Sequence, residues 1–248
     1  MKRSLYLLGV ASLVFGAASA SAAGINLGWN DCPGGAYYAL AEMFACDTNE
    51  GVHTLVGSFV APAGVLGMSG NEIVIDMQTS GAALAPWWSL RASAPAGCRP
   101  TALTQSGDFT AGPFTCFDYW QGGASGATSM DPPVANRARI KAIEALPAES
   151  PLITSIAEGT EVYSFMLRIE NSQTVDPGSC GGCTDEACIV LTSIRIIQPV
   201  EIGPIINVEP NYPLVLWQGW STTDPVYQCP WTVPARTQTW GSIKALYR

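Results

Sequence analysis

Acid–base chemistry in this chain would have to use a single histidine or a scattered set of carboxylates. His53 is the one histidine, so any Ser-His-Asp or Cys-His mechanism would depend on it. Its neighbours, Gly51 to Leu55, are typical of a turn that enters a strand, which favours an incidental loop histidine. A glycosidase needs two carboxylates about 5–10 Å apart. The candidates are Asp76, Asp118, Asp131, Glu144, Asp185 and Glu186.

Aromatic residues beside Gly and Pro indicate a second kind of site, which would bind rather than react. Exposed aromatic rings stack on the apolar faces of sugars and also anchor protein partners. We predict a stacking platform made of Trp87, Trp88, Tyr119 and Trp120, which form two aromatic pairs in the sequence. The competing interpretation is that these large rings fill a small core.

A third candidate site is the segment from Asp47 to Gly51, in which oxygen-bearing side chains precede a glycine turn. Calcium prefers such hard oxygen ligands. Asp47, Asn49 and Glu50 are therefore its predicted ligands, although an Asx turn would explain the same residues. The sequence indicates no other cofactor, because a single histidine argues against imidazole-based zinc, copper or iron catalysis.

The chain has eight cysteines, and an even number in an exported protein predicts up to four disulfides. They are Cys32, Cys46, Cys98, Cys116, Cys180, Cys183, Cys188 and Cys229. Local spacing favours pairing Cys32 with Cys46 and Cys98 with Cys116. The last four would then pair among themselves.

Two other interpretations apply to the cluster of Cys180, Cys183 and Cys188. A thiolate zinc site would need a fourth ligand, for which Cys229 or His53 is available. A redox-active Cys-x-x-Cys pair would need a strand-to-helix context, whereas the flanking residues are typical of strands and turns. Oxidising surroundings favour disulfides over both alternatives.

The first 23 residues have the organisation of a secretory signal peptide: a basic start at Met1–Arg3, an apolar run over Leu5–Ala18 and small residues over Ser19–Ala23. Cleavage would remove two basic residues and change the formal net charge from −8 to −10. No later stretch reaches the roughly 20 apolar residues of a spanning helix. We therefore predict a secreted, periplasmic or cell-surface protein. Without a basic cluster it has no expected nucleic-acid partner.

Several segments alternate apolar and polar residues with a period of two, which predicts half-buried strands. In the run Ile73–Gln78 the apolar face carries Ile73, Ile75 and Met77, and in Tyr163–Ile169 all odd-numbered residues share one face. Further strands are expected over Thr54–Val60, Trp87–Ala92, Cys188–Ile197 and Leu214–Gln218. With 25 Gly and 18 Pro marking turns, the chain predicts an all-β, antiparallel sandwich of Ig-like or jelly-roll-like type.

One segment has helical spacing instead, because Ile140, Ile143 and Leu146 recur within Asn136–Leu146 between flanking prolines. We predict one short helix there, inside a loop and helix insertion at about 111–151. Residues 24–238 are expected to form one sandwich domain, and a split into two modules near Pro151 is the alternative. Residues 239–248 are expected to form a basic amphipathic tail.

Three sequence strings support a resemblance: Trp29-Asn30-Asp31-Cys32, Phe44-Ala45-Cys46-Asp47-Thr48-Asn49 and Leu55-Val56-Gly57-Ser58-Phe59. Together with the cysteine cluster and the Trp240–Arg248 tail, the chain resembles a group of uncharacterised secreted bacterial proteins. The predicted sandwich is also similar to bacterial cohesin and carbohydrate-binding domains, which is an analogy of fold alone.

These observations favour a secreted, non-catalytic binding or structural module for carbohydrate or another cell-surface component. A first alternative is an extracellular, carboxylate-dependent hydrolase of glycosidase type. A second alternative is a structural protein of an envelope, filament or matrix, in which the tail mediates assembly or retention.

Overall fold

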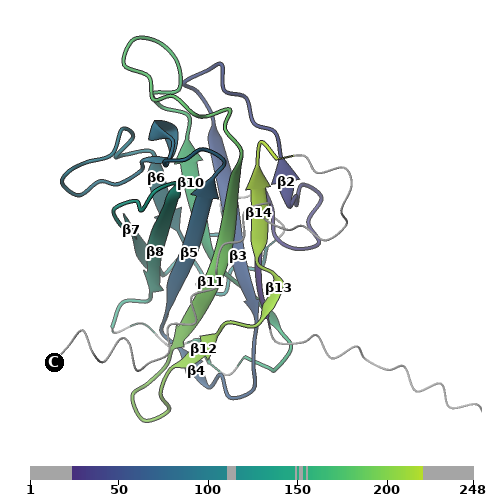
Figure 1. Cartoon of the computed structure of the whole chain (residues 1–248). Helices are drawn as coiled ribbons and strands as arrows, with labels where there is room; N and C mark the ends of the chain where they lie inside the picture. Colours follow the sequence, from purple (N-terminus) through teal and green to yellow (C-terminus); the bar gives the residue numbers. More distant parts are fainter. Residues whose placement is uncertain (1–23, 111–115, 149, 151–152, 155, 220–248) are drawn as a thin grey trace, which may run out of the picture.

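The computed structural model describes residues 24–110, 116–148, 150, 153–154 and 156–219. Two sheets stack face to face as a β-sandwich (Figure 1). Sheet A contains, in spatial order, β13 (Pro210–Tyr212), β1 (Gly24–Trp29), β3 (Val52–Val60), β10 (Glu161–Glu170) and β6 (Leu103–Ser106). Sheet B contains β2 (Ala41–Glu42), β14 (Leu214–Trp217), β11 (Ala187–Ile197), β5 (Gly70–Thr79), β8 (Arg137–Ala145) and β7 (Ser125–Met130). In addition, β12 (Ile205–Asn207) pairs with β11, and β4 (Gly67–Met68) pairs with β9 (Ile153–Thr154).

The longest strands follow the alternation expected from the sequence. In β5 the side chains of Ile73, Ile75 and Met77 are buried in the core, and β5 pairs antiparallel with β11 on one side and β8 on the other. The predicted strands within β3, β5, β10, β11 and β14 are confirmed, and with them the all-β sandwich. The predicted strand Trp87–Ala92 is wrong, because Pro86–Trp88 forms a 3-10 turn, for which proline at the first position is well suited.

The predicted helix over Asn136–Leu146 is also wrong, because most of it forms β8. This strand pairs with β5 and with β7, so both of its edges are hydrogen-bonded. Its burial alternates with a period of two along the strand. Ala, Arg, Lys and Glu are good helix formers, but intrinsic propensity is a small effect, and pairing on two sides overrides it. The expected insertion at 111–151 therefore contains two strands of sheet B, β7 and β8.

The disulfides join parts of the chain that are far apart, and the predicted local pairs are wrong. Cys32 bonds to Cys116, Cys46 to Cys183 and Cys98 to Cys180, across sequence separations of 84, 137 and 82 residues. A sandwich brings loops from distant strands to the same end, so the closest partners are remote in sequence. Because Cys180 and Cys183 belong to different disulfides, neither of the two alternatives, a thiolate zinc site or a redox pair, applies to them. Cys188 is buried in β11.

A β-bulge changes which residues of β10 face the core. The register shifts between Tyr163 and Phe165, so the two residues are paired with the neighbouring residues Ser58 and Gly57 of β3. Phe165, Leu167 and Ile169 are buried in the core as expected, whereas Tyr163 lies on the outer face of sheet A. The extra residue, Ser164, is fully buried and points toward sheet B, where it contacts Asn71.

The two sheets differ in how their outer faces are covered. Every residue of β1 and the last six residues of β3 are buried, so this part of sheet A is covered on both faces. On the outer side, the ring of Tyr38 lies directly over Gly28 and its hydroxyl donates to the carbonyl of Leu27. In sheet B, β8 alternates between buried and exposed residues, so its outer face is open.

Some expectations concern residues outside the described part of the chain. They are the signal peptide over 1–23, the tail over 239–248 and the partner of Cys229. Within the described residues, no helix is long and apolar enough to cross a membrane.

Candidate functional site

Three of the four residues predicted to form a stacking platform belong to the core. Trp87 and Trp88 are fully buried, and Trp120 is 2% exposed. The Nε1 groups of Trp87 and Trp120 donate to the Thr174 hydroxyl and the Ser164 carbonyl. The expectation that these three indoles present open faces is wrong. Tyr119, the fourth residue, is partly exposed.

The buried indoles surround Trp217, which lies at the end of β14. Its ring contacts five other rings at centroid distances of 4.2 to 5.8 Å, those of Trp29, Phe44, His53, Trp87 and Trp88. Aromatic pairs at such distances and tilted geometries stabilise a core beyond the area they bury. These aromatic residues therefore hold together the end of the sandwich that carries the Cys46–Cys183 disulfide.

Arg99 and His53 complete this cluster as structural groups. The fully buried guanidinium of Arg99 lies 3.7 Å from the Trp87 ring centroid and donates to the carbonyls of Trp87, Glu170 and Ser172. Burial lowers the pKa of Arg99 to about 10. His53 lies 2.8 Å from the Asn171 side-chain oxygen, and burial lowers its pKa. The expectation of a loop histidine is wrong, because His53 lies in β3, where its ring packs against those of Phe44 and Trp217.

The predicted calcium loop is held by hydrogen bonds within the protein. The side-chain oxygen of Asn49 accepts from the backbone N–H groups of Thr174 and Val175, at 2.7 and 3.0 Å. Its amide donates to the Val175 carbonyl and to the Asp176 carboxylate. The side chain of Asn49 thus connects this loop to the segment after β10, and calcium binding by Asp47, Asn49 and Glu50 stays a prediction.

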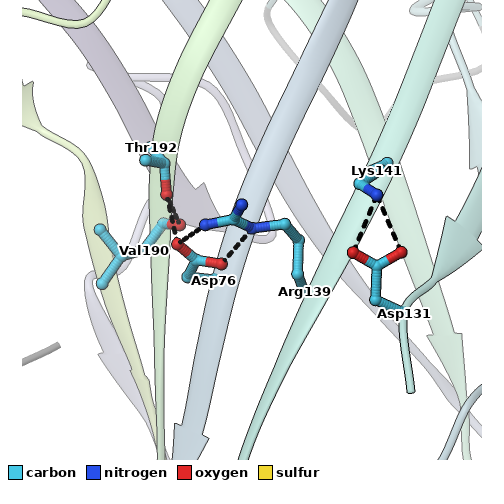
Figure 2. Close-up of polar contacts among 6 residues, drawn as sticks. All are labelled: Asp76, Asp131, Arg139, Lys141, Val190 and Thr192. Atoms are coloured by element: carbon cyan, nitrogen blue, oxygen red, sulfur yellow. Dashed lines mark hydrogen bonds and ion pairs between the residues drawn. The ribbon is translucent and has the colours of Figure 1, made fainter. Parts of the chain in front are cut away.

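Two of the carboxylates proposed for hydrolysis, Asp76 and Asp131, form ion pairs with basic side chains of β8 (Figure 2). Asp76 accepts two hydrogen bonds from Arg139, at 2.7 and 2.8 Å, and a third from Thr192. Asp131 pairs with Lys141 at 2.8 Å. These pairs lie on the outer face of sheet B, where they neutralise one another.

Asp118 accepts from the backbone N–H groups of Trp120 and Gly122, at 2.8 Å each, and so shapes the turn after Cys116. Glu144 points into the sandwich and is fully buried. Desolvation, together with the charge of Asp118, raises the pKa of Glu144 to about 7, although a hydrogen bond from Gln105 opposes the shift. Glu144 therefore lies in the interior of the sandwich, and Asp118 stabilises a turn.

An exposed aromatic surface does exist, on the outer side of sheet A. Phe117 is 63% exposed and packs edge-on against Tyr119, with ring centroids 4.7 Å apart. Burial raises the pKa values of Tyr119 and Tyr163, and the charge of Glu161 raises both further, so the two phenols lie near this carboxylate. We call Phe117, Tyr119, Tyr163 and Glu161 the aromatic patch.

The polar member of the aromatic patch is fixed in place. Glu161 Oε1 accepts from the amide of Asn26 at 2.7 Å and from the hydroxyl of Ser58. These two partners lie on β1 and β3 and are 2% and 0% exposed. Phe117 and Tyr119 follow Cys116, whose disulfide to Cys32 ties this segment to the end of β1, whereas Tyr163 and Glu161 lie on β10. The arrangement combines an open ring and a phenol on the disulfide-bonded segment with a second phenol and a positioned carboxylate on a strand of sheet A.

The sequence prediction included Tyr119, but it missed Phe117 and Glu161 and placed Tyr163 on the same face as the core residues of its strand. A signal for Phe117 was present, because Phe117 and Tyr119 are two residues apart and lie beside a cysteine. Glu161 could not have been found from the sequence. Its proximity to Tyr119 depends on a disulfide and on the bulge in β10.

Comparison with known proteins gives fold-level neighbours only. No protein-family model matches the chain, and no curated protein matches it. The sixth cohesin of Acetivibrio cellulolyticus scaffoldin B, solved in complex with a Cel5 dockerin, aligns at 9% identity and a TM-score of 0.30, covering 78% of this chain and 97% of the cohesin. The second type II cohesin of the ScaA adaptor scaffoldin from the same organism aligns at 11% identity and a TM-score of 0.30, covering 76% and 87%. These scores are too low to assign the chain to the cohesins.

Proposed function

We propose that this protein is a non-catalytic binding module that acts outside the cytoplasm and takes carbohydrate, or another cell-surface component, at the aromatic patch. The observation that carries the proposal is the exposed Phe117 ring, packed on Tyr119 beside the positioned carboxylate of Glu161. Sugars present apolar faces that stack on such rings and hydroxyls that donate to carboxylates. The aromatic patch offers both kinds of contact on one surface.

The segment that carries Phe117 and Tyr119 is held in place before a ligand binds, and this favours binding. Phe117 and Tyr119 follow a disulfide-bonded cysteine, and Asp118 between them caps the turn through two backbone N–H groups. A ligand that meets such a pre-organised surface loses less conformational entropy than one that must order a free loop. The disulfides and the predicted signal peptide support an extracellular setting.

The test is depletion of the purified, oxidised protein from solution by insoluble polysaccharides and by cell-envelope fractions, with released sugar assayed in the same tubes. We expect depletion without sugar release. Replacing Phe117 by Ala should weaken binding about tenfold, which corresponds to about 1.4 kcal/mol. The matched control is Ile143→Ala, which removes an exposed apolar side chain from the outer face of sheet B and should bind as the parent does.

The alternatives give different outcomes in the same tubes. Sugar release would favour the carboxylate-dependent hydrolase. Neither depletion nor release would favour a structural role that depends on residues 239–248, and deletion of the tail would then be the next variant. Depletion that Phe117→Ala leaves unchanged would contradict the aromatic patch as the binding surface.

A further inference from the structure

The charge of the aromatic patch determines which kind of sugar it suits. The carboxylate of Glu161 is partly exposed, and both hydrogen bonds that it accepts from the described residues end on Oε1, one from Asn26 and one from Ser58. Its second oxygen, Oε2, has no donor in that part of the chain. The patch therefore offers a ligand a carboxylate oxygen whose position is already fixed by contacts to β1 and β3.

Two further carboxylates lie beside the aromatic rings. Asp118 directly precedes Tyr119, and its two oxygens accept from backbone N–H groups of the turn rather than from a basic side chain. Asp31 acts on Tyr163, because desolvation raises the pKa of this phenol and the charges of Glu161 and Asp31 raise it further. The rings of the aromatic patch therefore lie in a negative field.

The described residues place their basic side chains away from the aromatic patch. Four of these side chains lie on β8 and β11 of sheet B, where the three ion pairs between described residues are found. They are Arg137, Arg139, Lys141 and Arg195. Arg99 is buried against Trp87, and Arg91 donates within its own loop. Arg168 is the one other basic side chain of the described part of the chain.

Arg168 lies on the same strand as two members of the aromatic patch, but farther along it. It pairs with Thr54 of β3, whereas Tyr163 pairs with Ser58, so the two positions are about 13 Å apart along the sheet. Its charge acts on Asp108, whose pKa is lowered by hydrogen bonds from the neighbouring threonine and then by Arg168. Among the described residues, no basic group shifts the pKa of either phenol of the patch.

We propose that the ligand of the aromatic patch is an amino sugar that carries a protonated amine. This inference rests on the proposed function and names the class of carbohydrate. One unit of such a sugar presents an apolar ring face, which can stack on the exposed ring of Phe117. It also presents an ammonium group, which can donate a charge-assisted hydrogen bond to Glu161 Oε2. The patch is thus complementary to this ligand in shape of contact and in charge.

Charge distinguishes amino sugars from other carbohydrates at this surface. An ammonium group is attracted by a carboxylate and by the face of an aromatic ring. An N-acetylated amino sugar has the same apolar faces but a neutral amide, so it loses the attraction to the carboxylate. A uronic acid carries a carboxylate of its own and is repelled by Glu161 and Asp118. The expected order of affinity is therefore amino sugar, N-acetylated sugar and uronic acid.

The test measures the binding of three soluble hexamers to the full oxidised protein by isothermal titration calorimetry. The hexamers consist of glucosamine, of N-acetylglucosamine and of galacturonic acid. In about 0.15 M salt we expect the glucosamine hexamer to bind about tenfold more tightly than the acetylated one, and the acidic one not to bind. The difference should shrink in about 1 M salt, where charges are screened beyond about 3 Å.

Substitutions separate a specific site from general attraction of a cation to an acidic protein. Glu161→Gln keeps an oxygen that can accept from Asn26 and Ser58 but removes the charge, so it should weaken binding of the glucosamine hexamer about tenfold and leave the acetylated hexamer unchanged. Phe117→Ala should weaken both. The matched control is Glu72→Gln, which changes the net charge equally on the outer face of sheet B and should bind both hexamers as the parent does.

Three results would overturn the inference. Equal affinity for the glucosamine and acetylated hexamers would contradict it, yet would leave the proposed function intact if Phe117→Ala still weakened both. Equal losses in Glu161→Gln and Glu72→Gln would show attraction by net charge alone. Binding of hexalysine as tight as that of the glucosamine hexamer, with the same dependence on Phe117 and Glu161, would assign the aromatic patch to a lysine-bearing protein. The proposed function itself fails only if no carbohydrate or envelope fraction binds in a manner that depends on Phe117.

Discussion

The outer faces of the two sheets differ: other segments of the chain cover that of sheet A, whereas that of sheet B is open to solvent. On sheet A, β1 is buried along its whole length and the covering segments are tied down by disulfides, among them Cys32–Cys116. On sheet B, the outward side chains of β5, β8 and β11 carry ion pairs and are open to solvent. The covered face therefore supports a fixed surface that can carry the aromatic patch, whereas the open face carries ion pairs that contact solvent.

The difference predicts where stability resides. Covering a sheet on its second face buries additional apolar area, and each Å² contributes about 25 cal/mol. Ion pairs between exposed side chains contribute about 0–1 kcal/mol each. Substitutions that uncover sheet A should therefore be far more damaging than substitutions on the outer face of sheet B.

The largest effect is expected when the covering segment of sheet A is released. Replacing both Cys32 and Cys116 by Ser should lower the free energy of unfolding by about 2–5 kcal/mol, because the disulfide closes a long loop in the unfolded chain. Urea unfolding of the oxidised proteins measures this loss. The same double variant should lose ligand binding at the aromatic patch at temperatures where it is still folded. A free energy of unfolding equal to that of the parent would show that the Cys32–Cys116 disulfide does not stabilise the fold.

A smaller loss is expected from a single methyl group under the cover. Gly28→Ala would place a Cβ on the ring of Tyr38, which lies directly over this glycine. Overpacking of this kind typically costs about 1–3 kcal/mol. The double variant with Tyr38→Ala removes the obstructing ring, so it should lose less stability than the two single changes summed. Additive losses would show that the two residues do not press on each other.

The sequence predicts features that depend on neighbouring residues better than features that depend on contacts between distant segments. The core strands were predictable because Ile73, Ile75 and Met77 alternate with polar residues, a local pattern. β8 was mistaken for a helix because Ile143 faces outward and Glu144 inward, which breaks the alternation and mimics helical spacing. Once the structure is known, the inversion is seen to bury the Glu144 side chain between the two sheets.

The covered face of sheet A was hidden for a different reason. Its disulfide, Cys32–Cys116, joins residues that are 84 positions apart, and the other two disulfides span 137 and 82 positions, so spacing along the chain carries no information about any of them. The burial of Trp87 and Trp88 likewise depends on Trp217, which arrives from the other end of the sequence. The residue types indicated that these aromatic side chains matter to the protein, but only tertiary contacts determine which rings are exposed to solvent.

The aromatic cluster around Trp217 should also affect how stability depends on pH, because it contains His53. Burial among the rings of Phe44 and Trp217 lowers the pKa of His53, so the unfolded chain binds a proton that the folded protein resists. The contribution of His53 to the free energy of unfolding should therefore be retained above about pH 6.5 and should fall as the pH drops below that value. Glu144, whose pKa is raised to about 7, acts in the opposite direction, because the folded protein takes up its proton more readily than the unfolded chain does. Urea unfolding of the parent and of His53→Gln at pH 7.5 and 5.5 isolates the contribution of His53. The variant should lose less stability on acidification than the parent, and an identical pH dependence in the two proteins would contradict a role for His53.

The smallest effects are expected on the outer face of sheet B, where a double-mutant cycle can separate its ion pairs. Asp76 and Arg139 form a two-bond pair with 16% and 29% side-chain exposure, so their coupling should be about 1 kcal/mol. Asp131 and Lys141 are 41% and 52% exposed, so theirs should be at most about 0.5 kcal/mol and should vanish in 1 M salt. Couplings are measured from urea unfolding of the single and double Ala variants. A coupling between Asp131 and Lys141 as large as the stability lost without the Cys32–Cys116 disulfide would contradict the prediction. The outer face of sheet B would then contribute as much to stability as the covered face of sheet A.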